Sequence, residues 1–208
     1  MIIDFTSQTP TQIYHLMTQS IAPRPIAWIL TENDADNATD PYNLAPFSYF
    51  NAVASNPPMV MVSIGVQPNG DPKDTLSNIQ RTGKMVIHIA SAHHIDALNQ
   101  SSASLPYGES ELPDSQMTTE PFDGFELPKL KSARVALACE LDHTHLISSS
   151  PQTLVFAQIK MAFFDESITE QDQKGRLKIN AEKLAPIARL GGNEYALLGK
   201  FINKKRPA

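Results

Sequence analysis

Residues 43–65 read NLAPFSYFNAVASNPPMVMVSIG, and this stretch decides the fold. It contains three short runs with the composition of β-strands, at 43–48, 49–54 and 59–65. The last run is continuously apolar, which predicts a strand that is buried on both faces. Three short strands in close succession indicate a mainly β protein.

The flanking sequence extends this pattern in both directions. Four further strands are expected, at 25–31, 85–90, 134–147 and 153–164. Three short helices are expected, one after the Thr9-Pro10 cap, one at 74–81 before Gly83, and one at 93–100. Many strands, short connections and a few small helices predict a closed or nearly closed β-barrel with added helices. We expect residues 1–208 to form it as a single domain.

Composition restricts the possible functions. The net charge is -5 and the basic residues are scattered, which argues against a nucleic-acid-binding protein. The single cysteine, Cys139, excludes an internal disulfide and a cysteine-based metal cluster. No run approaches ~18 apolar residues, and the first residues do not have the pattern of a signal peptide. We therefore expect no membrane span and a cytoplasmic location.

The segment Lys73-Asp74-Thr75 is the first candidate binding site, because it begins an expected helix. A helix N-terminus presents backbone N–H groups and a partial positive charge, which suit a phosphate group. Lys73 would add a charge and Thr75 a hydroxyl donor. The alternative is that Asp74 caps the helix and Lys73 is solvated.

Arg24, held between two prolines, is the second candidate for an anion contact. Its alternative is a surface arginine in a stiff connector.

Residues 43–48 are the third candidate. Pro46 removes a donor from the strand ladder, so neighbouring backbone groups and the Ser48 hydroxyl would face a flat heterocycle instead of another strand. The alternative is an edge strand with a bulge.

The fourth candidate combines Arg189, which shortly precedes two glycines, with Tyr195, a side chain suited to stacking on an aromatic ligand. Its alternative is a turn with a core tyrosine.

Several familiar catalytic patterns are absent from the sequence. It has no GxGxxG or GxxxxGK[ST] phosphate motif, and no Ser-His-Asp or paired-carboxylate spacing. His143 and His145 share one face of an expected strand, but two histidines alone make a poor metal site. Cys139 and Trp28 are expected in the core. We therefore predict no metal site and assign no catalytic residue.

Four blocks, taken in order, resemble the flavin reductase-like domain family: APRPIAWI, NLAPFSYFNAVASNPPMVMVSIG, KDTLSNIQRTGKMVIHI and RLGGNEYALLGKF. The resemblance runs from about residue 20 to about residue 206. Relatives in this family include flavoredoxin and the small reductase components of two-component monooxygenases. The resemblance implies an FMN-binding split β-barrel that forms a homodimer, with FMN near the subunit boundary.

The resemblance also implies a set of cofactor-binding residues. The flavin ring would lie along the strand segment Asn43, Leu44, Ala45, Pro46, Phe47 and Ser48. The phosphate would be held by Lys73, Asp74 and Thr75, with Arg24 as a second contact near the phosphate or ribityl chain. Ser63, in the following strand, would also reach the ligand. Arg189 and Tyr195 would lie near the flavin or the dimer contact.

The activity implied by the resemblance is hydride chemistry. NAD(P)H would reduce the flavin, and the electrons would pass to an unidentified acceptor, such as a partner monooxygenase or an electron-transfer protein. One alternative is an FMN-bound electron carrier that does not use NAD(P)H. Another is a non-catalytic flavin-binding protein. The irregular segment 101–130 would either cover the flavin or brace the dimer.

Overall fold

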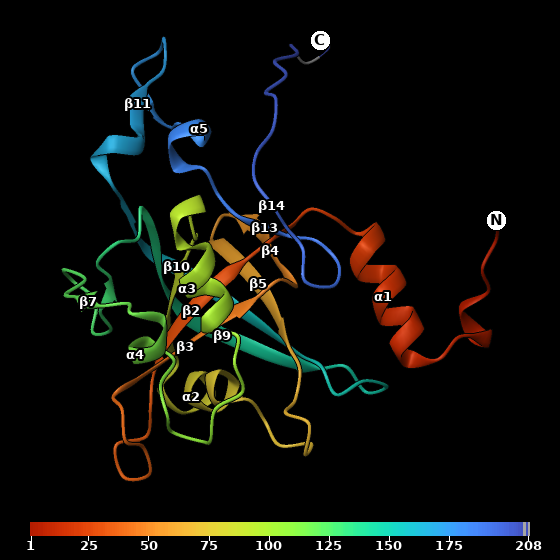
Figure 1. Cartoon of the computed structure of the whole chain (residues 1–208). Coiled ribbons are helices and arrows are strands. Elements are labelled where there is room, and N and C mark those ends of the chain that lie inside the picture. The colour runs from red at the N-terminus through yellow and green to blue at the C-terminus, as the bar shows by residue number, and fades with distance from the viewer. Residues whose placement is uncertain (206, 208) are drawn as a thin grey trace.

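The computed structural model describes residues 1–205 and 207; Arg206, at the end of the span of family resemblance, lies outside them. A seven-stranded antiparallel sheet lies at the centre of the molecule, in the order β3-β2-β6-β9-β10-β5-β4 (Figure 1). Its strands are β2 (Ala27–Glu32), β3 (Tyr42–Phe47), β4 (Phe50–Ser55), β5 (Pro58–Ile64), β6 (Lys84–His88), β9 (Val135–Leu146) and β10 (Thr153–Phe164). This confirms the expected mainly β fold of the split-barrel type.

The remaining strands form three small sheets. They are β1 (Arg24–Pro25), β13 (Ala188–Arg189) and β14 (Tyr195–Ala196) in one sheet, β7 (Thr119–Glu120) with β8 (Lys129–Leu130), and β11 (Thr169–Gln171) with β12 (Leu177–Ile179). The first of these sheets joins the C-terminal third of the chain to its N-terminal part, because β1 pairs with β13.

The helices are short. They are α1 (Pro10–Ser20), α2 (Asp74–Thr82), α3 (Ile95–Gln100), α4 (Leu112–Ser115) and α5 (Ala181–Leu184), with 3-10 turns η1 (Phe5–Ser7), η2 (Ala92–His94) and η3 (Glu166–Ile168). Within the described residues, none of them is long and apolar enough to cross a membrane.

The local signals at helix ends are confirmed. Thr9 and Gln12 form a capping box at the start of α1, with Pro10 as its first residue. α2 ends at Gly83, whose φ of +71° is the left-handed conformation that favours glycine. The predicted hairpin is β9 and β10, which pair along almost their whole length.

One prediction about the barrel strands is wrong. The run at 59–65 was expected to be buried on both faces, but in β5 only Val60, Val62 and Ile64 are buried, and the residues between them are half exposed. The physical reason is that one face of β5 packs into the core, whereas the other face, with the neighbouring strand β4, is not covered by any described element of this chain.

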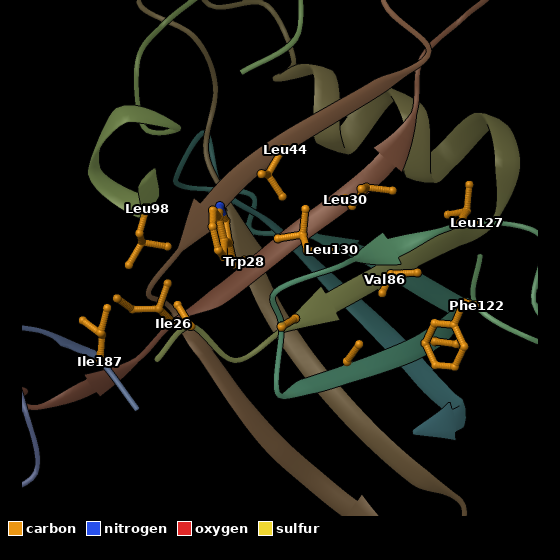
Figure 2. Close-up of a cluster of buried hydrophobic side chains, with 14 residues drawn as sticks. Ile26, Trp28, Leu30, Leu44, Val86, Leu98, Phe122, Leu127, Leu130 and Ile187 are labelled. Atoms are coloured by element: carbon orange, nitrogen blue, oxygen red, sulfur yellow. The ribbon is translucent and has the colours of Figure 1, made fainter. Parts of the chain in front are cut away.

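Two apolar clusters lie on opposite faces of β2. Ala27 and Ile29 belong to an inner cluster with residues from five other strands, and α2 adds Leu76 and Ile79 to it. Trp28 and Leu30 point the other way into an outer cluster (Figure 2). Since successive side chains of a strand alternate, β2 is buried on both faces. The helix α2 is therefore fixed against the barrel by its own apolar face.

The irregular segment 101–130 covers the outer cluster. Phe122, Leu127 and Leu130 are buried in it (Figure 2). Leu112 and Met117 pack against it from α4 and the turn that follows. The segment thus supplies the apolar cover that one face of a sheet needs when no long helix packs on it. The beginning of the same segment also reaches the candidate site described below.

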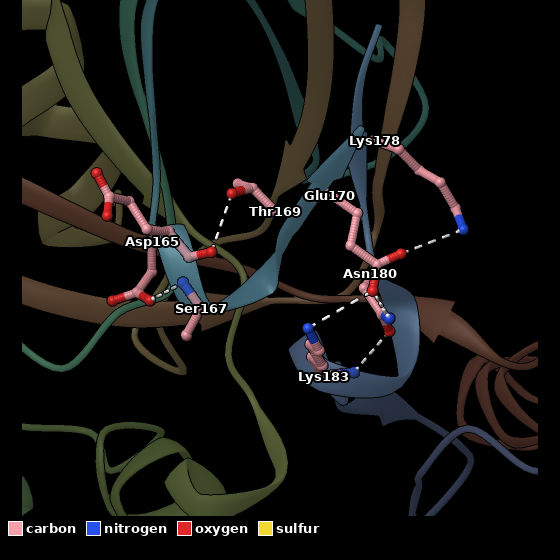
Figure 3. A network of polar contacts seen from close by, with 8 residues as sticks. Asp165, Ser167, Thr169, Glu170, Lys178, Asn180 and Lys183 are labelled. Atoms are coloured by element: carbon pink, nitrogen blue, oxygen red, sulfur yellow. Dashed lines mark hydrogen bonds and ion pairs between the residues drawn. The ribbon is translucent and has the colours of Figure 1, made fainter. Parts of the chain in front are cut away.

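The hairpin β11–β12 and helix α5 lie close together at one end of the molecule (Figure 1). Glu170 accepts a hydrogen bond from Asn180 at 2.5 Å and lies 3.6 and 3.5 Å from the ammonium groups of Lys178 and Lys183 (Figure 3). The hydrogen bond from Asn180 is the main reason that the pKa of Glu170 lies below its usual value. Asn180 also caps α5. These groups are solvated, so their ion pairs contribute little to stability.

Candidate functional site

A cavity of about 410 Å³ lies between β3, the N-terminus of α2 and the start of the segment 101–130. This volume is within the range of small-molecule sites in proteins. Seven of the residues expected to bind a cofactor line it: Asn43, Ala45, Pro46, Phe47, Lys73, Asp74 and Thr75. The structure therefore brings together the two sequence segments that were expected to hold a ring and a phosphate.

The strand β3 forms the apolar wall of this cavity. It is an edge strand of the main sheet, and its pairing with β2 runs without a register shift. The alternative interpretation, an edge strand with a bulge, is therefore right about the edge position and wrong about the bulge. Pro46 is tolerated because an edge strand has one side without ladder partners. The rings of Pro46 and Phe47 and the methyl group of Ala45 give a ligand an apolar surface.

The N-terminus of α2 forms the polar end. Lys73 is the N-cap residue and makes no capping hydrogen bond with its side chain, while its carbonyl accepts from Leu76 and Ser77. Within the described residues, the backbone N–H groups of Asp74 and Thr75 have no acceptor. A helix start with unpaired N–H groups and a neighbouring ammonium group fits a phosphate. The Lys73 ammonium lies 5.7 Å from the centre of the Phe47 ring, so the polar end adjoins the apolar wall.

Asp74 and Thr75 also hold this end of the site together. The Asp74 carboxylate accepts from the Gly108 backbone at 3.0 Å and from the Gln67 amide at 3.3 Å. Asp74 therefore ties two loops to the helix and does not cap it. The Asn43 amide donates to the Thr75 hydroxyl at 2.9 Å, and both side chains are buried. Thr75 keeps its hydroxyl hydrogen as a donor for a ligand.

Glu111 is a cavity residue that the sequence did not indicate. It is 7% exposed, and its Oε2 accepts a hydrogen bond from the Leu44 backbone N–H at 3.0 Å. Burial raises the pKa of Glu111 to about 7. The Leu44 side chain is fully buried in the outer cluster, so Leu44 contributes to this site through its backbone only. Glu111 lies in the irregular segment 101–130, where no periodic pattern marks a residue as inward-facing.

Four other expected site residues gather away from the cavity, around β1, β13 and β14. Arg24 donates to the Ser48 hydroxyl at 3.4 Å and to the backbone carbonyls of Ile21 and Leu190 at 2.8 and 2.7 Å. It also contacts the Thr18 carbonyl. None of these residues lines the cavity.

Arg189 and Tyr195 complete this second group. The Arg189 guanidinium carbon lies 4.4 Å from the centre of the Tyr195 ring, and the Tyr195 hydroxyl donates to Asn99 at 3.2 Å. Tyr195 also packs against the outer cluster, as its alternative interpretation expected. Ser63 lies elsewhere, on β5, and donates to the Gln152 side chain at 3.2 Å.

The antiparallel sheet, with a cavity between its edge strand β3 and the N-terminus of α2, fits the class of split-barrel proteins. Residues 19–178 match the family model described as "Flavin reductase like domain". The chain therefore belongs to the flavin reductase-like family. This confirms the resemblance inferred from the four sequence blocks.

Several known proteins are similar to this chain over nearly its whole length. An uncharacterized protein of Halalkalibacterium halodurans is 33% identical, with 93% of this chain and 90% of that protein covered. The structure of nitrilotriacetate monooxygenase component B from Bacillus cereus is also 33% identical, with a TM-score of 0.86 and 98% of each chain covered. A 2-nitrobenzoate 2-nitroreductase from Pseudomonas fluorescens, 24% identical, has the same fold with a TM-score of 0.85, covering 100% of this chain and 96% of that one.

Proposed function

We propose that this protein binds FMN in the cavity and acts as an NAD(P)H-dependent oxidoreductase that passes electrons to a further acceptor. The observation that carries the proposal is the pairing of a phosphate-competent helix N-terminus at Lys73 with an apolar wall at Pro46 and Phe47 in one cavity of about 410 Å³. When bound, FMN supplies the hydride chemistry, while the protein supplies position, hydrogen bonds and exclusion of water.

The proposed roles follow from what each residue offers. Ala45, Pro46 and Phe47 provide a surface for the ring, and Asn43 orients the Thr75 hydroxyl. The backbone N–H groups of Asp74 and Thr75 donate to the phosphate, with Lys73 as its counter-charge. In this proposal the group of Arg24, Ser48, Arg189 and Tyr195 serves the outer edge of the ring or the contact with a second copy of the chain, and Ser63, which lies apart from that group on β5, does the same.

A homodimer is part of the proposal. β4 is an edge strand of the main sheet, and all its residues after Phe50 are exposed, including Val53. Met61 on the neighbouring strand β5 is half exposed. An exposed edge strand with apolar side chains is a liability that natural proteins cover. A second copy of the chain would cover it, and a solution mass equal to that of one chain would exclude this.

The alternative is an FMN-bound electron carrier or a flavin-binding protein without turnover. Anaerobic mixing of the FMN-loaded protein with NADH and with NADPH separates the two, since reduction bleaches the flavin absorbance. Rapid bleaching with either donor supports the reductase. A protein that keeps its yellow colour with both donors, but binds FMN, is a carrier or a binder. A protein that binds no FMN contradicts both.

The Lys73→Ala variant tests the phosphate assignment. Loss of a charged hydrogen-bonding partner is expected to cost roughly 1.5 to 3 kcal/mol, which is about 10- to 150-fold in the dissociation constant of FMN. Titration of FMN fluorescence measures it. Riboflavin, which lacks the phosphate, should bind the variant and the wild type equally, and Lys73→Arg should recover most of the FMN affinity. Equal FMN affinities in wild type and Lys73→Ala would remove Lys73 from the site.

The electron acceptor, the domain organisation and the location of the protein are also part of the proposal. The similar Bacillus cereus protein is a monooxygenase component, which supports a monooxygenase or an electron-transfer protein as the acceptor of electrons here. The two apolar clusters share the strand β2, which supports a single domain over residues 1–208. The single cysteine, buried Cys139, fits a reducing compartment such as the cytoplasm, which cell fractionation would test.

A further inference from the structure

The charges around the cavity are unfavourable for an anionic ligand. Of the residues that the structure describes, one cation, Lys73, lines it together with three carboxylates, those of Asp74, Glu109 and Glu111. A phosphate placed at the start of α2 would therefore be close to several negative charges. How each carboxylate is solvated and bonded decides how it responds to that phosphate.

The three carboxylates differ in their surroundings. Glu109 is exposed, so water screens its charge. Asp74 accepts two hydrogen bonds, from the Gly108 backbone and the Gln67 amide. Glu111 is 7% exposed and accepts one hydrogen bond from another residue, the Leu44 N–H. Of the three, Glu111 thus has the least solvent and the least support for a negative charge.

We propose that Glu111 takes up a proton from solvent when a phosphorylated ligand enters the cavity, and that it faces the bound ligand as a neutral acid. The proposal rests on the FMN site proposed above. It names Glu111 as the residue whose protonation makes ligand binding at that site depend on pH. In its neutral form Glu111 has a hydroxyl donor in place of a negative charge.

The groups packed around Glu111 explain the direction of the effect. From β3 it receives the Leu44 N–H, and from α2 it faces Asp74, which raises its pKa, and Lys73, which lowers it. Burial is the largest cause and already brings the pKa of Glu111 to about 7. A ligand phosphate would pair with Lys73 and add its own negative charge. Both changes disfavour the Glu111 carboxylate, so the pKa rises further in the complex.

The experiment is isothermal titration of the purified full-length protein with FMN between pH 7 and pH 8.5, in buffers of different ionisation enthalpy. The second ionisation of a phosphate monoester lies near pH ~6, so the ligand phosphate is a dianion throughout this range. A rise of about one unit in the pKa of Glu111 gives uptake of about half a proton at pH 7.5. It also makes FMN binding about fourfold weaker at pH 8.5 than at pH 7.

Variants and a second ligand isolate the effect of Glu111. Glu111→Gln keeps an acceptor for the Leu44 N–H but cannot ionise, so its FMN affinity should not change over this pH range. Glu109→Gln is the matched control, because it removes the same charge from the exposed part of the cavity lining; it should keep the proton uptake of the wild type. Riboflavin, which has no phosphate, should bind without uptake.

The outcomes separate this inference from the proposed function. FMN binding by the wild type without proton uptake overturns the role of Glu111 and leaves the FMN site standing. Proton uptake that persists in Glu111→Gln also overturns it. If the protein binds no FMN at any pH, the proposed function fails, and this inference fails with it.

Discussion

Replacing Trp28 by alanine is expected to lower the free energy of unfolding by about 3 to 5 kcal/mol. The Trp28 side chain is fully buried in the outer cluster, and its removal leaves a large cavity between the sheet and the segment 101–130. The variant also loses the hydrogen bond from the indole N–H to the Ser101 hydroxyl at 2.8 Å. Because Trp28 is the only tryptophan, denaturant unfolding should be followed by circular dichroism.

Two variants serve as controls for Trp28→Ala. Trp28→Phe keeps most of the buried ring but loses the hydrogen bond, and a cost of about 1 to 2 kcal/mol is expected. Leu146→Ala removes an exposed apolar side chain and should change stability by less than about 0.5 kcal/mol. A loss below about 1 kcal/mol for Trp28→Ala would mean that the outer cluster does not hold the segment 101–130 in place.

The Trp28 hydrogen bond also connects the core to the candidate site. Ser101 lines the cavity and donates to the Leu98 carbonyl of α3 at 3.0 Å, while it accepts from the indole. The wall of the cavity formed by the start of the segment 101–130 is thus positioned from the outer cluster. Trp28 was expected in the core, and its position there is confirmed.

The sequence predicted the parts of the site that carry local signals. Pro46 marks an interrupted strand, and Lys73 precedes an amphipathic helix that ends at Gly83. The conformation of each segment can therefore be predicted from its local sequence. The family resemblance then predicted that these segments face one ligand. Glu111 and Ser101 carry no such signal, because their positions depend on how an irregular segment packs on the outer cluster.

The prediction for β5 failed for a related reason. A continuous apolar run shows that both faces of a strand are apolar. It does not show whether elements of the same chain pack on both faces. Met61 and Ser63 are half exposed because the described elements of this chain pack on one face only. Likewise, the position of Arg24 between two prolines predicted a fixed guanidinium, but not that backbone carbonyls such as that of Leu190 would be its acceptors.

Acidification is expected to destabilise the fold through His88. This side chain is completely buried; its Nδ1 lies 3.1 Å from the Trp28 carbonyl, and its Nε2 accepts from the Leu130 N–H at 3.0 Å. Both ring nitrogens are therefore satisfied only in the neutral form. Burial lowers the pKa of His88 to about 3, against 6.5 for an unperturbed histidine. Protonation would leave the Leu130 N–H without its acceptor.

The direction of the change in stability with pH follows from the number of protons that the folded and unfolded states bind. Between pH 6.5 and pH 3 the unfolded chain holds a proton on His88 that the folded protein does not, so stability falls as the pH is lowered. At about 1.4 kcal/mol per pH unit, the loss from pH 6 to pH 4 is about 3 kcal/mol from this residue. Urea unfolding at a series of pH values measures it. His94, whose burial lowers its pKa to about 4, adds a smaller loss of the same sign.

Two non-ionising variants isolate the contribution of His88. His88→Gln offers a donor for the Trp28 carbonyl and an acceptor for the Leu130 N–H, whereas His88→Phe offers neither and should be less stable by about 1 to 3 kcal/mol at neutral pH. Both should lose about 3 kcal/mol less than the wild type between pH 6 and pH 4. The titrations of His94 and Glu111 remain in all three proteins, so they cancel in this difference. Parallel stability curves for the wild type and His88→Gln would show that His88 is not neutral and buried in the folded protein.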